Sequence, residues 1–148
     1  MITIKKFYIE AAFPNGTEFE PIPFEKGINL IVGERSSNKA KKSQQEKMNS
    51  VGKSLRVEMI NYCLLKDSSH SRVSKIPFDV LPTEAYLCLD LEYESDAEIK
   101  RIQIKRSRDD RNPIIITVDG EAAEFENKEL DKAIEYLSHY FLYTLGDK

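Results

Sequence analysis

The sequence predicts a single α/β domain, and three observations support this fold class. A nearly all-apolar run at residues 28–32, bracketed by Gly27 and Gly33, is typical of a short strand buried on both faces. Alternating or β-branched segments between residues 85 and 125 predict an antiparallel β-subdomain. Apolar side chains at helical spacing over residues 127–145 predict an amphipathic terminal helix.

The N-terminal part is predicted to form a strand, a hairpin and a second strand. Residues 1–10 alternate between apolar and polar side chains, and Pro14-Asn15-Gly16 then signals a turn. The buried strand at residues 28–32 follows. Residues 34–50 are almost entirely polar, so we interpret them as a mobile loop.

A helix and a meander are expected in the middle of the chain. Residues 55–65 are apolar on most sides, which predicts a helix buried between layers. Serines and prolines in residues 66–82 indicate a loop. The strands of the meander are expected at residues 86–94, 99–106, 114–118 and 121–125. Asp119-Gly120 supplies the two-residue turn between the last two strands.

Composition excludes several classes of function. A chain of 148 residues, 41% hydrophobic and 32% charged, buries a core without a disulfide or a metal, so we assign residues 1–148 to one domain. Cys63 and Cys88 lie in separate apolar runs, which indicates buried reduced thiols and no redox chemistry. No run approaches the ~18–20 apolar residues of a membrane span, and the N-terminus has a strand pattern instead of a signal peptide. We therefore expect a cytoplasmic protein that does not bind membranes.

The net charge of -3 conceals an uneven distribution along the chain. Residues 35–48 carry five basic side chains against one acid, and residues 99–111 carry six against two. From residue 119 onwards, eight acids face three lysines. A basic run on a strand or loop is either a solvated face or a site for phosphates, and both interpretations stay open for residues 99–111.

Residues 33–54 carry the motif that is most informative about function. A phosphate-binding loop needs a glycine after a buried strand, four further residues, and then Gly-Lys-Ser or Gly-Lys-Thr at the start of a helix. Gly52-Lys53-Ser54 supplies the second half, but eighteen residues separate Gly33 from Gly52. Leaving out the polar, basic residues 35–48 restores the spacing. A surface insertion of this length adds little loop-closure entropy, so an interrupted phosphate loop is physically reasonable.

The chemistry of the motif fits a nucleotide. Gly52 allows the backbone to approach a phosphate, Lys53 places a charge on the outer phosphates, and the Ser54 hydroxyl is a ligand for Mg²⁺. The alternative is that Gly-Lys-Ser occurs by chance at a helix start. The glycine-ended strand before it and the apolar helix after it favour nucleotide binding.

Three segments resemble one family of ATPases. They are Lys5-Lys6-Phe7, Phe24-Glu25-Lys26-Gly27-Ile28-Asn29-Leu30-Ile31-Val32-Gly33-Glu34 and Asn49-Ser50-Val51-Gly52-Lys53-Ser54-Leu55. They are similar to the N-terminal head segment of SMC, RecN and RecF type ABC ATPases, in particular to a bacterial branch of coiled-coil ATPases with an insertion in the phosphate loop. The resemblance is densest over residues 1–65. It implies a P-loop ABC-type head lobe with an antiparallel β-subdomain and a terminal helix.

The resemblance implies ATP and Mg²⁺ as cofactors. Lys53 and backbone N–H groups would contact the β- and γ-phosphates, and Ser54 would bind Mg²⁺. The candidate nucleotide-binding residues, which match the Walker A motif and its continuation into the helix, are Gly33, Asn49, Ser50, Val51, Gly52, Lys53, Ser54 and Leu55.

The other half of such an ATPase site is missing from the sequence. We find no Leu-Ser-Gly-Gly-like signature, no Walker B Asp-Glu and no switch histidine. The chain alone is therefore expected to bind nucleotide weakly and to hydrolyse it negligibly. Either it is the N-terminal piece of a longer polypeptide, or it is complete and takes the C-terminal lobe from a partner. The resemblance further implies a homodimer through the heads and a role in DNA repair, chromosome maintenance or anti-phage defence.

A basic strand is the candidate contact for nucleic acid. Arg101 and Lys105 share one face of the predicted strand at residues 99–106, and Arg106 and Arg108 follow. Attraction to phosphates needs no sequence-specific geometry, and related heads bind duplex DNA across their upper surface. The alternative function is therefore a non-catalytic module that has kept the fold and binds nucleic acid or a protein partner.

Overall fold

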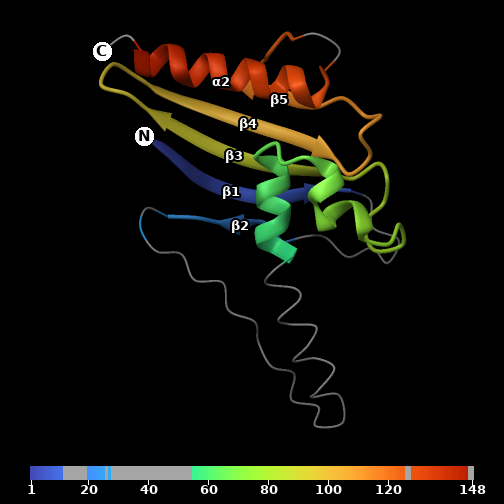
Figure 1. Ribbon diagram of the computed structural model, residues 1–148. Coiled ribbons are helices and arrows are strands. Elements are labelled where there is room, and N and C mark those ends of the chain that lie inside the picture. The colour runs from blue at the N-terminus through green and yellow to red at the C-terminus, as the bar shows by residue number, and fades with distance from the viewer. Residues whose placement is uncertain (12–19, 26, 28–54, 126–127, 147–148) are drawn as a thin grey trace.

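One antiparallel sheet forms the centre of the structure (Figure 1). The computed structural model describes residues 1–11, 20–25, 27, 55–125 and 128–146, and within them six strands pair in the order β2-β1-β3-β4-β5-β6. The strands are β1 (Ile2–Glu10), β2 (Ile22–Pro23), β3 (Tyr86–Glu94), β4 (Ile99–Ser107), β5 (Ile115–Val118) and β6 (Glu121–Ala122). The α/β class and the antiparallel meander are confirmed. The expected turn at residues 14–16 and the expected strand at residues 28–32 lie outside the described residues.

The register of the strands gives the sheet one apolar and one polar face. Leu89 on β3 pairs with Phe7 on β1 and with Ile104 on β4, and all three side chains are fully buried. The next residue on β3, an aspartate, pairs with Lys6 and Gln103. Because successive side chains of a strand point to opposite faces, these three polar groups lie on the other side of the sheet.

Two helices cover the apolar face. Residues 55–63 are helical, and α2 spans Leu130–Gly146. Figure 1 shows α2 along the β4–β5 side of the sheet and the first helix against the β1–β3 side. The side chains that both helices add to the core are Met59, Tyr62, Cys63, Ala133 and Leu137. Neither helix, as far as the structure describes them, has the length and apolar character needed to cross a membrane.

The first helix is less enclosed than its sequence predicted. Val57 is 53% exposed and Leu64 is 45% exposed, although we expected burial between two layers. Within the described residues, the sheet covers only one side of this helix. The apolar residues on its outer side therefore remain exposed there.

The connection between the first helix and β3 is more regular than the predicted loop. It contains two short 3-10 helices, η2 (Ser68–His70) and η3 (Arg72–Lys75). Asp67 accepts a hydrogen bond from the backbone N–H of Ser69, and Ser71 caps the second turn in the same way. These caps satisfy backbone donors that would otherwise lack partners.

The turn between β5 and β6 is confirmed. Asp119 and Gly120 have φ angles of 50° and 84°, which is the left-handed region that a type I′ turn needs at both central positions. The Asp119 carboxylate also accepts a 2.9 Å hydrogen bond from the backbone N–H of Arg101. The turn is thereby tied to the adjacent strand β4.

Both cysteine side chains are buried and unpaired, as predicted. Burial raises the pKa of the Cys63 thiol and raises the pKa of Cys88 to about 12. Both thiols are therefore protonated and unreactive near neutral pH in the folded protein.

Candidate functional site

The structure describes the helix that follows the predicted phosphate loop. Leu55 is the one candidate nucleotide-binding residue within the described residues, and it starts the helical segment 55–63. Its side chain is partly buried and packs against the core. The candidate residues outside the described part of the chain are Gly33, Asn49, Ser50, Val51, Gly52, Lys53 and Ser54. The geometry of the site is therefore built from this helix and from the contacts that hold it.

Tyr62 attaches the helix to the sheet. Its ring is fully buried, and its hydroxyl donates a 2.7 Å hydrogen bond to the backbone carbonyl of Ser107 at the end of β4. Burial raises the pKa of Tyr62 to about 12, so the hydroxyl stays protonated and acts as a donor. The contact fixes the rotation of the helix about its own axis.

The helix ends in a Schellman motif. The N–H of Leu65 donates to the carbonyl of Tyr62, and the N–H of Lys66 donates to the carbonyl of Asn61. Leu65 has a φ of 67°, a conformation that is unfavourable for a bulky side chain. Burial of the leucine side chain in the core offsets this strain. The chain therefore turns sharply at a fixed point beside β4.

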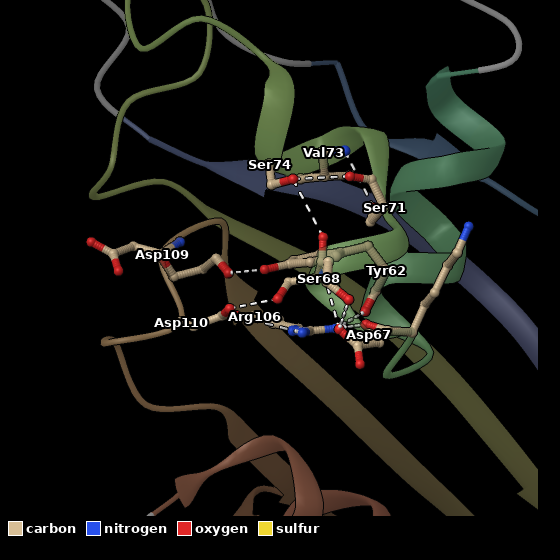
Figure 2. A network of polar contacts seen from close by, with 12 residues as sticks. Tyr62, Asp67, Ser68, Ser71, Val73, Ser74, Arg106, Asp109 and Asp110 are labelled. Atoms are coloured by element: carbon tan, nitrogen blue, oxygen red, sulfur yellow. Dashed lines mark hydrogen bonds and ion pairs between the residues drawn. The ribbon is translucent and has the colours of Figure 1, made fainter.

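Arg106 binds this end of the helix (Figure 2). Its Nη1 donates to the carbonyl oxygen of Tyr62 at 2.9 Å and to that of Lys66. Its guanidinium carbon lies 3.8 Å from the centre of the Tyr62 ring, which is a cation–π contact. A cation near the carboxyl end of a helix also interacts favourably with the helix dipole. Arg106, 2% exposed, is therefore a buried cation compensated largely by the helix end.

Arg108 makes equivalent contacts to the connection that follows the helix. Its Nη1 donates to the carbonyl of Leu81 at 2.9 Å, and its Nη2 donates to that of Ser74 at 3.0 Å. The guanidinium lies 4.3 Å from the centre of the Phe78 ring. Together the two arginines bind four backbone carbonyls between residues 62 and 81.

These contacts divide the four residues that we predicted as a nucleic-acid surface. Arg101 and Lys105 lie on the polar face of β4, as expected, whereas Arg106 and Arg108 are buried on the opposite side. The expectation of one exposed basic run was therefore wrong for these two arginines. A signal was present in the sequence, because Arg106 continues the period of two set by the buried Ile102 and Ile104.

The basic groups on the polar face are partly neutralised. Lys105 lies 2.9 Å from a carboxylate oxygen of Glu10, and this hydrogen bond raises the pKa of Lys105. Lys6 pairs with Asp90 at 3.7 Å. A groove of about 410 Å³ on the same face is lined by Arg101, Lys5, Asp90 and Glu92 among others. A nucleic-acid backbone would therefore meet carboxylates as well as cations on this face.

A polar network joins the helix end to the segment after β4. Ser68 donates from its hydroxyl to one carboxylate oxygen of Asp110, and the other oxygen of Asp110 lies 3.7 Å from Arg106 Nη2. Figure 2 shows these groups around the Arg106 guanidinium. On the preceding residue, hydrogen bonds from Arg111 lower the pKa of Asp109 to about 2. The Asp109 carboxylate is therefore ionised at neutral pH.

Comparisons with known proteins identified no matching family model, no similar curated protein and no similar solved structure. The resemblance to SMC-like ATPases therefore stays a prediction from the sequence. The described geometry establishes how the helix after Gly52-Lys53-Ser54 is held on the sheet.

Proposed function

We propose that this chain is the ATP-binding N-terminal lobe of an SMC-like ATPase, with a P-loop ABC-type head fold. The observation that carries the proposal is the order of features along the chain. A glycine-ended apolar run comes first, Gly52-Lys53-Ser54 follows, and a helix packed on an antiparallel sheet comes directly after it. A helix in that position supports phosphate binding, since helix amino ends attract anions.

The proposed cofactors are ATP and Mg²⁺. Lys53 contacts the outer phosphates, the Ser54 hydroxyl binds Mg²⁺, and backbone N–H groups of Gly33 and residues 49–52 complete the phosphate site. Hydrolysis requires a C-terminal lobe in the same or another chain, and two heads associate as a homodimer. We place the protein in the cytoplasm, acting on DNA in repair, chromosome maintenance or anti-phage defence.

Calorimetric titration with Mg²⁺-ATP tests the proposal. The parent protein should bind ATP, and Lys53→Ala should lose this binding because the charge on the outer phosphates is removed. Lys41→Ala is the matched control, since it removes one lysine from the predicted insertion and leaves the motif intact. A parent that does not bind, or an equal loss in both variants, would contradict a working phosphate loop.

The alternative is a non-catalytic module that binds nucleic acid or a protein partner. The exposed Arg101 favours this alternative, whereas the ion pair of Lys105 with Glu10 reduces the positive charge available beside it. Fluorescence anisotropy with labelled duplex DNA at two salt concentrations measures this activity. DNA binding that persists in Lys53→Ala, together with no ATP affinity in the parent, would favour the alternative.

A further inference from the structure

We propose that Arg106 is a positioning residue for the helix that follows the predicted phosphate loop, an inference that rests on the function proposed above. Arg106 contacts this helix through the Tyr62 and Lys66 carbonyls and through the face of the Tyr62 ring. These contacts come from β4, about forty residues later in the chain than the helix. The sheet thereby sets where the helix ends.

The restraint is stiff because Arg106 is a buried charge. A guanidinium removed from water is tolerated only where hydrogen bonds and opposite charges compensate it. Nη1 has the two helix-end carbonyls, while Nη2 has no hydrogen-bond partner among the described residues and lies 3.7 Å from Asp110. If the helix end moved away, the cation would lose most of its compensation. The energy of the charged group therefore depends on the position of the helix.

The restraint at one end acts on the other end because the helix is short and rigid. The nine described helical residues span about 13 Å at 1.5 Å per residue. Tilting such a rod at its carboxyl end displaces its amino end, where the predicted phosphate loop joins. In enzymes, misplacement of a group by about 1 Å lowers activity by up to about a hundredfold. Arg106 is thus expected to act on nucleotide affinity without touching the nucleotide.

Arg108 provides a matched control. It lies two residues further along the chain, is similarly buried, and binds two backbone carbonyls and one aromatic ring. Its partners are Ser74, Leu81 and Phe78, none of which belongs to the helix. Arg106→Lys and Arg108→Lys keep the charge but replace the rigid, planar guanidinium, which lies over an aromatic ring, by a flexible ammonium group. Both should lower overall stability, but only Arg106→Lys should loosen the helix.

The two buried thiols report on the helix independently of any ligand. Cys63 lies in the helix, and Cys88 lies on β3. Peptide mapping after timed labelling with a thiol reagent gives the ratio of the two rates. This ratio should rise severalfold in Arg106→Lys and stay at the parent value in Arg108→Lys. Equal ratios in the parent and both variants would overturn the proposal.

A second pair of variants covers the case in which Arg106→Lys does not fold. Asp110 is 61% exposed, so Asp110→Asn should fold while weakening the compensation of Arg106. Asp109→Asn is its control, because Asp109 pairs with Arg111 instead. The labelling ratio of Cys63 to Cys88 should rise in Asp110→Asn and not in Asp109→Asn. Identical ratios in these two variants would also contradict the positioning role.

Titration of the same variants with Mg²⁺-ATP separates this inference from the proposed function. With a parent that binds ATP, Arg106→Lys should weaken affinity about tenfold and Arg108→Lys less than about twofold. Equal affinities in the two variants would overturn the positioning role while leaving the proposed function intact. A parent that does not bind ATP would overturn the proposed function, and the labelling ratio would then decide whether Arg106 positions the helix.

Discussion

The side-chain amide of Gln103 donates a 2.6 Å hydrogen bond to the Tyr8 hydroxyl and so joins β4 to β1 across the intervening strand β3. The same amide nitrogen donates to Asp90 on β3 at 2.9 Å. One side chain thus connects three strands on the polar face. The bond is partly buried, so its loss should be measurable in the stability of the whole sheet.

Tyr8→Phe should lower the free energy of unfolding by about 1 kcal/mol, because the amide loses one of its two acceptors. Urea denaturation monitored by circular dichroism measures this change. Tyr86→Phe is the control, since that hydroxyl donates an exposed 3.2 Å bond to the carbonyl of Pro113. The control should change stability by less than about 0.5 kcal/mol. Equal losses of stability in the two variants would show that the hydrogen bond between Gln103 and Tyr8 contributes no more than the exposed one.

Arg108→Met should destabilise the protein by about 3 kcal/mol, because the variant leaves the carbonyls of Ser74 and Leu81 without their donors. Arg101→Met removes the same group from the exposed face and should cost less than about 0.5 kcal/mol. Urea denaturation of both variants provides the comparison. A large loss in Arg101→Met, or none in Arg108→Met, would mean that the assignment of Arg101 to the exposed face or of Arg108 to the buried side is wrong.

The ion pair between Glu58 and Lys66 predicts a dependence of stability on pH. The two side chains lie 2.6 Å apart, and the hydrogen bond from Lys66 holds the pKa of Glu58 below its ordinary value of 4.5. Because the folded protein has the lower pKa, the pair stabilises it above pH 4.5, and this contribution is lost as the pH falls through the lowered pKa.

The free energy of unfolding should therefore decrease as the pH falls below 4.5, and it should decrease less steeply in Glu58→Gln. Urea titrations at several pH values measure the slope. Glu124→Gln is the control, because Glu124 is 91% exposed and lies 3.7 Å from Lys128. An unchanged slope in Glu58→Gln would show that this ion pair does not contribute to the loss of stability at low pH.

Gly120→Ala should cost about 1 kcal/mol, because alanine disfavours the φ of 84° that the turn requires. The added methyl group meets no atom within 4 Å, so the cost is conformational and not steric crowding. Gly120→Asn should recover part of the loss, since asparagine tolerates the left-handed region better. Thermal melts of the parent and the two variants measure the order of their stabilities. An alanine variant as stable as the parent would contradict the turn assignment.

Alternation of side chains was sufficient to predict most of the sheet. The predicted strand at residues 86–94 has the bounds of β3, Tyr86–Glu94, because a strand with one face on a core has a clear period of two. The terminal helix, predicted at residues 127–145, is observed at Leu130–Gly146. Its ends are less well defined because caps, and not periodicity, determine where a helix starts and stops.

The contacts at the helix end could not be predicted in the same way. Periodicity places Arg106 on the inner side of β4, but it does not reveal that Tyr62 and Lys66 supply carbonyls there. Those partners depend on how the chain turns after the helix, at a leucine with positive φ, where a glycine would be the usual signal. Of the candidate site, the helix after the motif is confirmed from residue 55 to residue 63. The phosphate loop itself stays a prediction.

The register of β1 has a consequence for the order of folding. Ile2 pairs with Tyr93, so the first strand can complete its pairing with β3 during synthesis only after more than ninety residues have been made. β3 and β4 are joined by a short connection and pair along their whole length. Local contacts form faster than distant ones, because less chain entropy is lost in closing the loop. We expect the β3–β4 hairpin to form first and to serve as the template on which the N-terminal strand docks last.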